Sequence, residues 1–99
     1  MDLSSIVNIG LLAKGTRDRV RALLQCEIMQ KSHVFDDFCE YYVVLNNLIH
    51  IIEEILLKID LKTQKNYENV EDLKEIYYKI RLCSEIEENL SNFFSLEIH

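Results

Sequence analysis

The stretch YYVVLNNLIHII, residues 41–52, is the most apolar part of the chain, and its pattern decides the fold. The pattern continues on both sides of this stretch in alternating steps of three and four residues, at Phe35, Phe38, Tyr42, Leu45, Ile49, Ile52, Leu56 and Ile59. This alternation is the heptad pattern of a helix that packs lengthwise against another helix. It predicts one long helix over residues 34–60.

A second apolar row runs beside the first on the same predicted helix. Its members are Val34, Tyr41, Val44, Leu48, Ile51 and Ile55. At about 100° per residue, the two rows together cover roughly half of the helix circumference. A face this wide predicts that the helix contacts two neighbours.

Helical patterning extends to the rest of the chain, which contains no proline and only two glycines. The C-terminal third carries a similar stripe, interrupted by Glu87 at one seam position. Residues 61–68 are polar and predict a loop, after which Asn69 suits the N-cap position of the last helix. The first third predicts a helix that Gly10 and Gly15 either kink or split.

These segments predict an all-α protein, an antiparallel three-helix bundle with coiled-coil-like packing in a single domain over residues 1–99. The expected helices span about residues 3–31, 34–60 and 69–97, with Ser32 as the cap of the second. Their similar lengths favour the bundle. The alternative is one continuous helix from Thr16 to about Asp60, which would need a second chain to cover it.

The composition limits the classes of partner. With 11 Lys and Arg against 17 Asp and Glu, the formal net charge is −6, which weighs against binding to nucleic acid or to an anionic membrane. The apolar stretch is too short and too interrupted to span a bilayer. The odd number of cysteines, three, and the lack of a signal-like start predict an intracellular location, cytoplasmic or nuclear.

No residue pattern predicts catalysis, a metal site, a cofactor or a small-molecule substrate. His50, Glu53 and Glu54 form a single metal-like group on one helix, whereas a helical di-iron site needs matching groups from several helices. Their positions predict that they face solvent, opposite the heptad stripe. Cys83 falls on the apolar stripe, where a cysteine acts as a small hydrophobic residue.

One basic cluster stands out from the acidic background. It comprises Lys14, Arg17, Arg19 and Arg21. Arg17 and Arg21 share a helix face and are candidate anion contacts. No aromatic residue lies among them to stack on bases, so a solvated surface, or ion pairs with the acidic residues at 36, 37 and 40, is favoured over nucleic-acid binding.

Binding through an apolar surface is the function that these patterns favour. Aromatic doublets at residues 41–42, 77–78 and 93–94 place rings on neighbouring faces, where one ring of each pair can anchor a partner. The predicted partner-binding residues are Tyr41, Val44, Leu48, Ile51, Ile55, Tyr78 and Phe93.

The sequence therefore predicts a non-enzymatic protein–protein interaction module, a helical adaptor or complex subunit, that forms a homodimer or binds a helix of another protein. The alternative is a small acidic inhibitor or regulator, for which a viral or phage origin is one option, that blocks a basic site on a host protein. The two differ in salt dependence, because apolar docking resists salt and electrostatic binding weakens.

Overall fold

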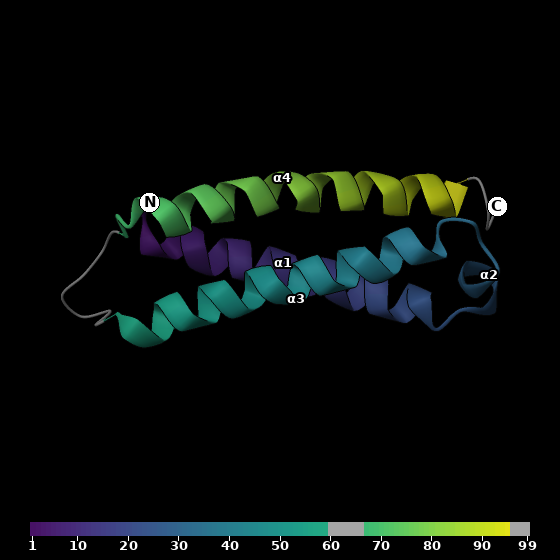
Figure 1. The fold of residues 1–99 in the computed structure, drawn as a ribbon, viewed down its shortest axis with the longest axis horizontal. Coiled ribbons are helices and arrows are strands. Elements are labelled where there is room, and N and C mark those ends of the chain that lie inside the picture. Colours follow the sequence, from purple (N-terminus) through teal and green to yellow (C-terminus); the bar gives the residue numbers. More distant parts are fainter. Residues whose placement is uncertain (60–66, 96–99) are drawn as a thin grey trace.

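The computed structural model describes residues 1–59 and 67–95, and over these residues the chain is helical, as the sequence predicts. The elements are α1 (Leu3–Leu24), α2 (Glu27–Gln30), α3 (Phe35–Lys58) and α4 (Val70–Phe93). Figure 1 shows the three long helices side by side, with α3 running in the opposite direction to α1 and α4. The short α2 lies in the connection between α1 and α3, at one end of the molecule.

The first predicted helix differs most from the structure. Helix α1 passes through Gly10 and Gly15 without a break, so of the two alternatives, a kink or a split, the split is wrong. It ends at Leu24 instead of continuing to residue 31, where the Gln25 N–H donates to the carbonyls of the preceding turn. The alternative of one continuous helix over residues 16–60 is also wrong. Helix α1 ends at Leu24 and α3 begins at Phe35, and the connection between them holds only the short α2.

The starts of the helices are set by local hydrogen bonds. Asn69 caps α4, as predicted, by accepting a hydrogen bond from the Asp72 N–H at 3.2 Å. The N-cap of α3 is Val34, and the predicted cap Ser32 instead accepts a hydrogen bond from the Val34 N–H through its hydroxyl oxygen. Most of the predicted loop at 61–68, and the predicted helix ends at 60 and 97, lie outside the described residues.

The start of α1 is capped by Asp2, a position that the apolar periodicity does not predict. The Asp2 carboxylate accepts hydrogen bonds from the hydroxyl of Ser4 at 2.9 Å and from its N–H at 3.2 Å. These bonds, led by the one from the hydroxyl, favour the charged carboxylate and lower the pKa of Asp2. Next to this cap, Met1 and Tyr67 exchange two backbone hydrogen bonds, which join the start of the chain to the segment before α4.

Small side chains line the buried face of α1, and one of them lies against α3. Gly10, Ala13 and Thr16 lie three residues apart on the buried face of α1. A Cβ atom added at Gly10 would lie 3.2 Å from Cγ2 of Ile52, so the two helices approach closely at this point. Helix α4 contributes larger buried side chains and packs less extensively on the other two helices.

The core runs along the space between the three long helices, and Met29 of α2 is fully buried at one end of it. Four of the predicted heptad positions of α3, Phe38, Leu45, Ile49 and Ile52, are almost inaccessible to solvent, whereas the other four are only part-buried. Leu48 and Ile55 of the second row are buried as well. Among the described residues, no helix has the length and apolar character needed to cross a membrane.

Candidate functional site

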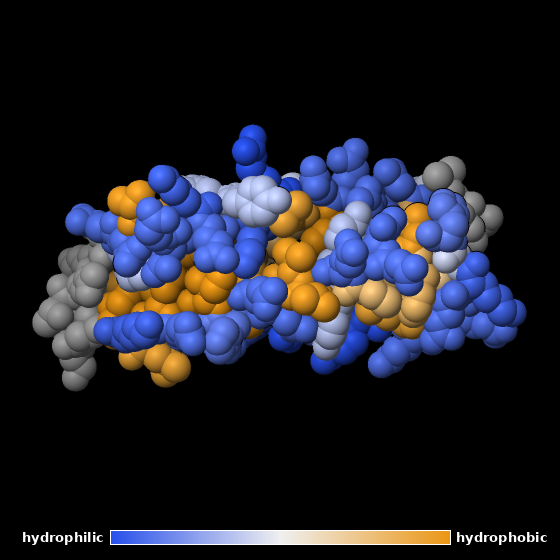
Figure 2. Space-filling model, viewed as in Figure 1, coloured by the Kyte–Doolittle hydropathy of each residue, from blue (hydrophilic) through white to orange (hydrophobic). Residues whose placement is uncertain are grey.

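The largest apolar area in the view of Figure 2 follows the space between α3 and α4, flanked by hydrophilic side chains. Tyr41 of α3 faces α4, because its hydroxyl accepts a hydrogen bond from the Asn89 amide at 2.7 Å. Val44 and Ile51 continue the row that Tyr41 begins, and Tyr78 lies three helical turns before Asn89 on α4. We call the surface formed by Tyr41, Val44, Ile51 and Tyr78 the α3–α4 face.

The seven predicted contact residues divide into two groups. Tyr41, Val44 and Ile51 are half-buried, and Tyr78 is 62% exposed. The other three, Leu48, Ile55 and Phe93, are between 0% and 4% exposed and belong to the core. In the folded chain these three side chains are covered by their neighbours, so they are not accessible to a partner.

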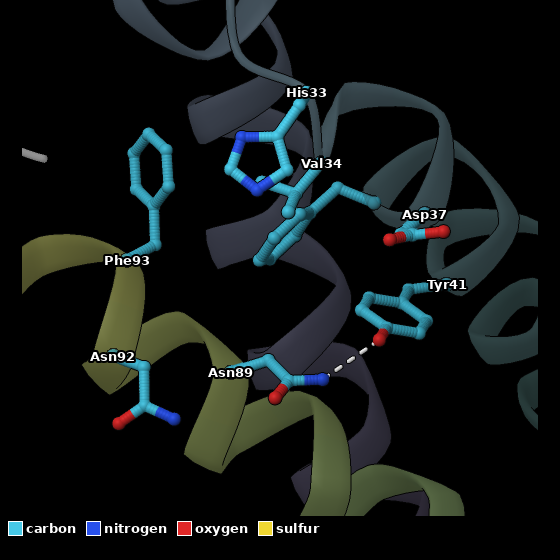
Figure 3. Close-up of a pocket in the computed structure, with 8 residues that line it drawn as sticks. His33, Val34, Asp37, Tyr41, Asn89, Asn92 and Phe93 are labelled. Carbon is cyan, nitrogen blue, oxygen red and sulfur yellow. Dashed lines mark hydrogen bonds between the residues drawn. The ribbon is translucent and has the colours of Figure 1, made fainter. Parts of the chain in front are cut away.

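A pocket of about 250 Å³ opens at one end of the α3–α4 face (Figure 3). Its lining comes from the segment before α3, from the first turns of α3 and from the last turns of α4. The lining residues are His33, Val34, Asp37, Phe38, Tyr41, Asn89, Asn92 and Phe93. Only Tyr41 and Phe93 among these are predicted contact residues, because the pocket depends on where the end of α4 lies beside α3.

Aromatic rings shape the pocket. The centroid of the Phe38 ring lies 5.2 Å from that of Tyr41 and 6.1 Å from that of Phe93, and both pairs pack edge to face. This arrangement is favourable for aromatic pairs and fixes the orientation of the rings. Phe38 and Phe93 are almost fully buried, so the apolar floor is held rigidly by the core.

The basic cluster is engaged in ion pairs, but not with the predicted partners. Lys14 pairs with Glu53 across α1 and α3 at 3.5 Å. Arg17 and Arg21 both lie 3.2 Å from the Asp18 carboxylate, so this carboxylate partly neutralises the proposed anion-binding pair. The fourth member, Arg19, pairs with Glu87 of α4.

Glu87, which interrupts the apolar stripe of α4, has a structural explanation. Its carboxylate accepts a hydrogen bond from the fully buried Thr16 hydroxyl at 2.6 Å, besides pairing with Arg19. A buried hydroxyl needs such a partner, and the carbonyl of Leu12, at 3.0 Å, is the alternative acceptor. Glu87 therefore joins α4 to α1 by polar contacts within an otherwise apolar seam.

The residues that could bind a metal or act as a nucleophile lie far apart or are buried. His50 and Glu54 lie 3.1 Å apart on the exposed side of α3, as the periodicity predicts. Cys83 is buried, and desolvation raises the pKa of its thiol. Within residues 1–59 and 67–95, no three His, Cys, Asp or Glu side chains gather closely enough to hold a metal ion.

Comparisons of the chain with protein-family models, curated proteins and solved structures gave no match. The geometry of the described residues is therefore what points to a site. The α3–α4 face and its pocket combine part-exposed apolar side chains, aromatic rings and polar groups at the rim. These are features of a recognition surface.

Proposed function

We propose that the chain is a non-enzymatic protein–protein interaction module, a helical adaptor or complex subunit. In this proposal the three long helices form an antiparallel bundle with coiled-coil-like packing and present the α3–α4 face to a partner. The supporting observation is that Tyr41, Val44 and Ile51 stay part-exposed in one row beside α4, with Tyr78 exposed on α4 itself. Aromatic and aliphatic side chains at the edge of a core are frequent interface anchors.

A second copy of the chain is the simplest partner. A homodimer with twofold symmetry uses the same surface on both subunits, so one apolar row can cover its equivalent on the other chain. Contact between two α3–α4 faces would bury the half-exposed row that the chain leaves open. Burial of this apolar surface would drive the association.

Two neighbouring valines of α3 provide a matched test of this surface. Val44 lies on the α3–α4 face, whereas Val43 is 58% exposed and projects about 100° away around the helix, outside that face. We expect the wild type to have the mass of a dimer at low micromolar concentration in analytical ultracentrifugation. Val44→Glu should give a monomer, because it places a charge in the interface, and Val43→Glu should leave the dimer intact.

Circular dichroism of both variants controls for folding, since each should keep the helical content of the wild type. A monomeric wild type, or dimers of equal stability in both variants, would contradict self-association through this face. Leu48→Glu is unsuitable for the test, because Leu48 is fully buried and a charge there would unfold the chain.

A second candidate function is supported by the charge distribution. Among the described residues, the basic cluster is paired with carboxylates, while Asp36, Asp37 and Glu40 form no ion pair. These three residues form an acidic edge at the start of α3, beside the pocket. In this alternative the chain is an acidic inhibitor or regulator that uses this edge to occupy a basic site on another protein.

A further inference from the structure

We propose that the pocket at the end of the α3–α4 face receives a lysine or arginine side chain of the partner protein. The aliphatic stem of that side chain would lie on the aromatic floor, and its charge would lie beside Asp37. This inference rests on the proposed interaction function and adds the chemistry that the partner must present.

The floor and walls of the pocket suit an aliphatic stem. Val34, Phe38 and Phe93 provide apolar surface, and Figure 3 shows the rings of Phe93 and Tyr41 on opposite sides of the space. Lysine and arginine bury their methylene groups on such surfaces while the charged end stays near water. Aromatic rings also attract a cation that approaches one of their faces.

The rim of the pocket favours a positive charge. With histidine counted as neutral, Asp37 carries the single formal charge among the described residues that line the pocket. The Asn89 amide group donates to Tyr41, so its carbonyl oxygen remains available to accept a hydrogen bond. Asn89 and Asn92 also lie in the last turns of α4, where the helix dipole places partial negative charge.

The size of the pocket favours a side chain over a cofactor. Its volume of about 250 Å³ is below the roughly 300–1,000 Å³ of typical small-molecule sites. An anionic ligand would meet Asp37 in the pocket and Asp36 and Glu40 on the same turns of α3. The charge and the volume therefore both select a short organic cation.

The first test compares three small probes of similar length that differ in charge: butylammonium, butanol and butanoate. Each is titrated into the full chain and followed by NMR chemical shifts of Phe38, Tyr41, Asn89 and Phe93. We expect butylammonium to bind about two- to fivefold more tightly than butanol, as for one partly exposed ion pair. Butanoate should bind most weakly.

Asp36 and Asp37 provide the matched variants. Asp37→Asn should remove the preference for butylammonium over butanol, because it removes the charge in the pocket. Asp36→Asn should retain that preference, because Asp36 is the neighbouring carboxylate but does not line the pocket. Equal binding of butylammonium and butanol to the wild type, or an equal effect of the two variants, would overturn the proposal.

A peptide pair tests whether the cation comes from a protein. The capped peptide Gly-Lys-Gly should shift the pocket resonances, and the same peptide with uncharged norleucine in place of lysine should bind more weakly. Binding of butylammonium without binding of the lysine peptide would exclude a partner side chain. The two proposals fail in different measurements. Absence of binding in these titrations would contradict the cation pocket, whereas a monomeric mass of the wild type would contradict the proposed dimer.

Discussion

Gly10 and Gly15 lie five residues apart in α1, but an alanine would meet different surroundings at each position. The Cβ at Gly10 would lie 3.2 Å from a methyl carbon of Ile52, while at Gly15 the nearest contact would be an Arg19 guanidinium nitrogen at 3.7 Å. Alanine stabilises a helix interior by about 1 kcal/mol relative to glycine. We therefore expect Gly15→Ala to raise the free energy of unfolding by about 1 kcal/mol.

Gly10→Ala should raise the free energy of unfolding by less than Gly15→Ala, because the tight contact with Ile52 offsets the gain in helix propensity. Urea denaturation followed by circular dichroism measures both differences. A greater stabilisation by Gly10→Ala than by Gly15→Ala would show that α1 and α3 do not approach closely at Gly10.

At the scale of the elements, the periodicity of apolar residues predicts α3 and α4 well, and the end of α1 poorly. The apolar spacing continues through Ile28 and Met29, and no proline or glycine marks the end of the helix at Leu24. The turn into α2 is instead favoured by burial of Met29 at the end of the core, a tertiary contact that local sequence does not specify.

The candidate site shows the same division between local and tertiary information. The row from Tyr41 to Ile55 is visible in the sequence, but the side on which α4 covers it is not. Only the structure shows that Leu48 and Ile55 are covered and belong to the core, while Val44 and Ile51 stay part-exposed. The sequence does not predict the pocket, because His33 and Asp37 meet Asn89 and Asn92 only when the start of α3 and the end of α4 lie side by side.

Helix α4 packs less extensively than α1 does on α3, and Cys83 on its buried face can report when it opens. In a Cys26→Ser/Cys39→Ser protein, we expect Cys83 to react slowly with a thiol reagent at pH 8 and rapidly in urea. Burial both blocks access and raises the pKa of the thiol, which keeps it protonated. Adding Ile76→Ala, which costs about 2–5 kcal/mol in a buried position, should accelerate labelling about tenfold or more.

The raised pKa also sets the direction of the pH dependence. Because the folded pKa of Cys83 lies above the reference value of 9.0, the unfolded chain loses this proton first as the pH rises. Its contribution to stability is complete below about pH 9 and is lost as the pH passes through the folded pKa. Urea denaturation at pH 8 and at pH 10 measures this loss. In the labelling experiment, reaction of Cys83 at the rate of an exposed thiol in the folded protein would contradict the packing of α4.

At the scale of the whole molecule, net charge separates the two proposed functions. Each copy carries a formal charge of −6, so two copies repel each other over distances that salt screens. If the α3–α4 face dimerises through apolar contact, the dimer dissociation constant should stay constant or fall between about 0.05 and 0.5 M NaCl. Sedimentation equilibrium across this range measures the effect.

A steep rise in the dissociation constant with salt would contradict apolar dimerisation. An acidic inhibitor should show that steep rise when it binds a basic polypeptide such as polylysine, since its affinity would come from opposite charges. Measuring both associations in the same buffers compares an apolar interface with an electrostatic one on the same chain.

The row of small residues on α1 also has an evolutionary consequence. A side chain larger than alanine at Gly10 would press on Ile52 of α3, and one at the fully buried Ala13 would overpack the core, whereas the exposed faces of the helices accept many substitutions at little cost. Distant homologues should therefore diverge freely over most of their length and still retain small residues at these two positions. These two positions add little to the overall sequence identity between homologues, but they should be among the last to change.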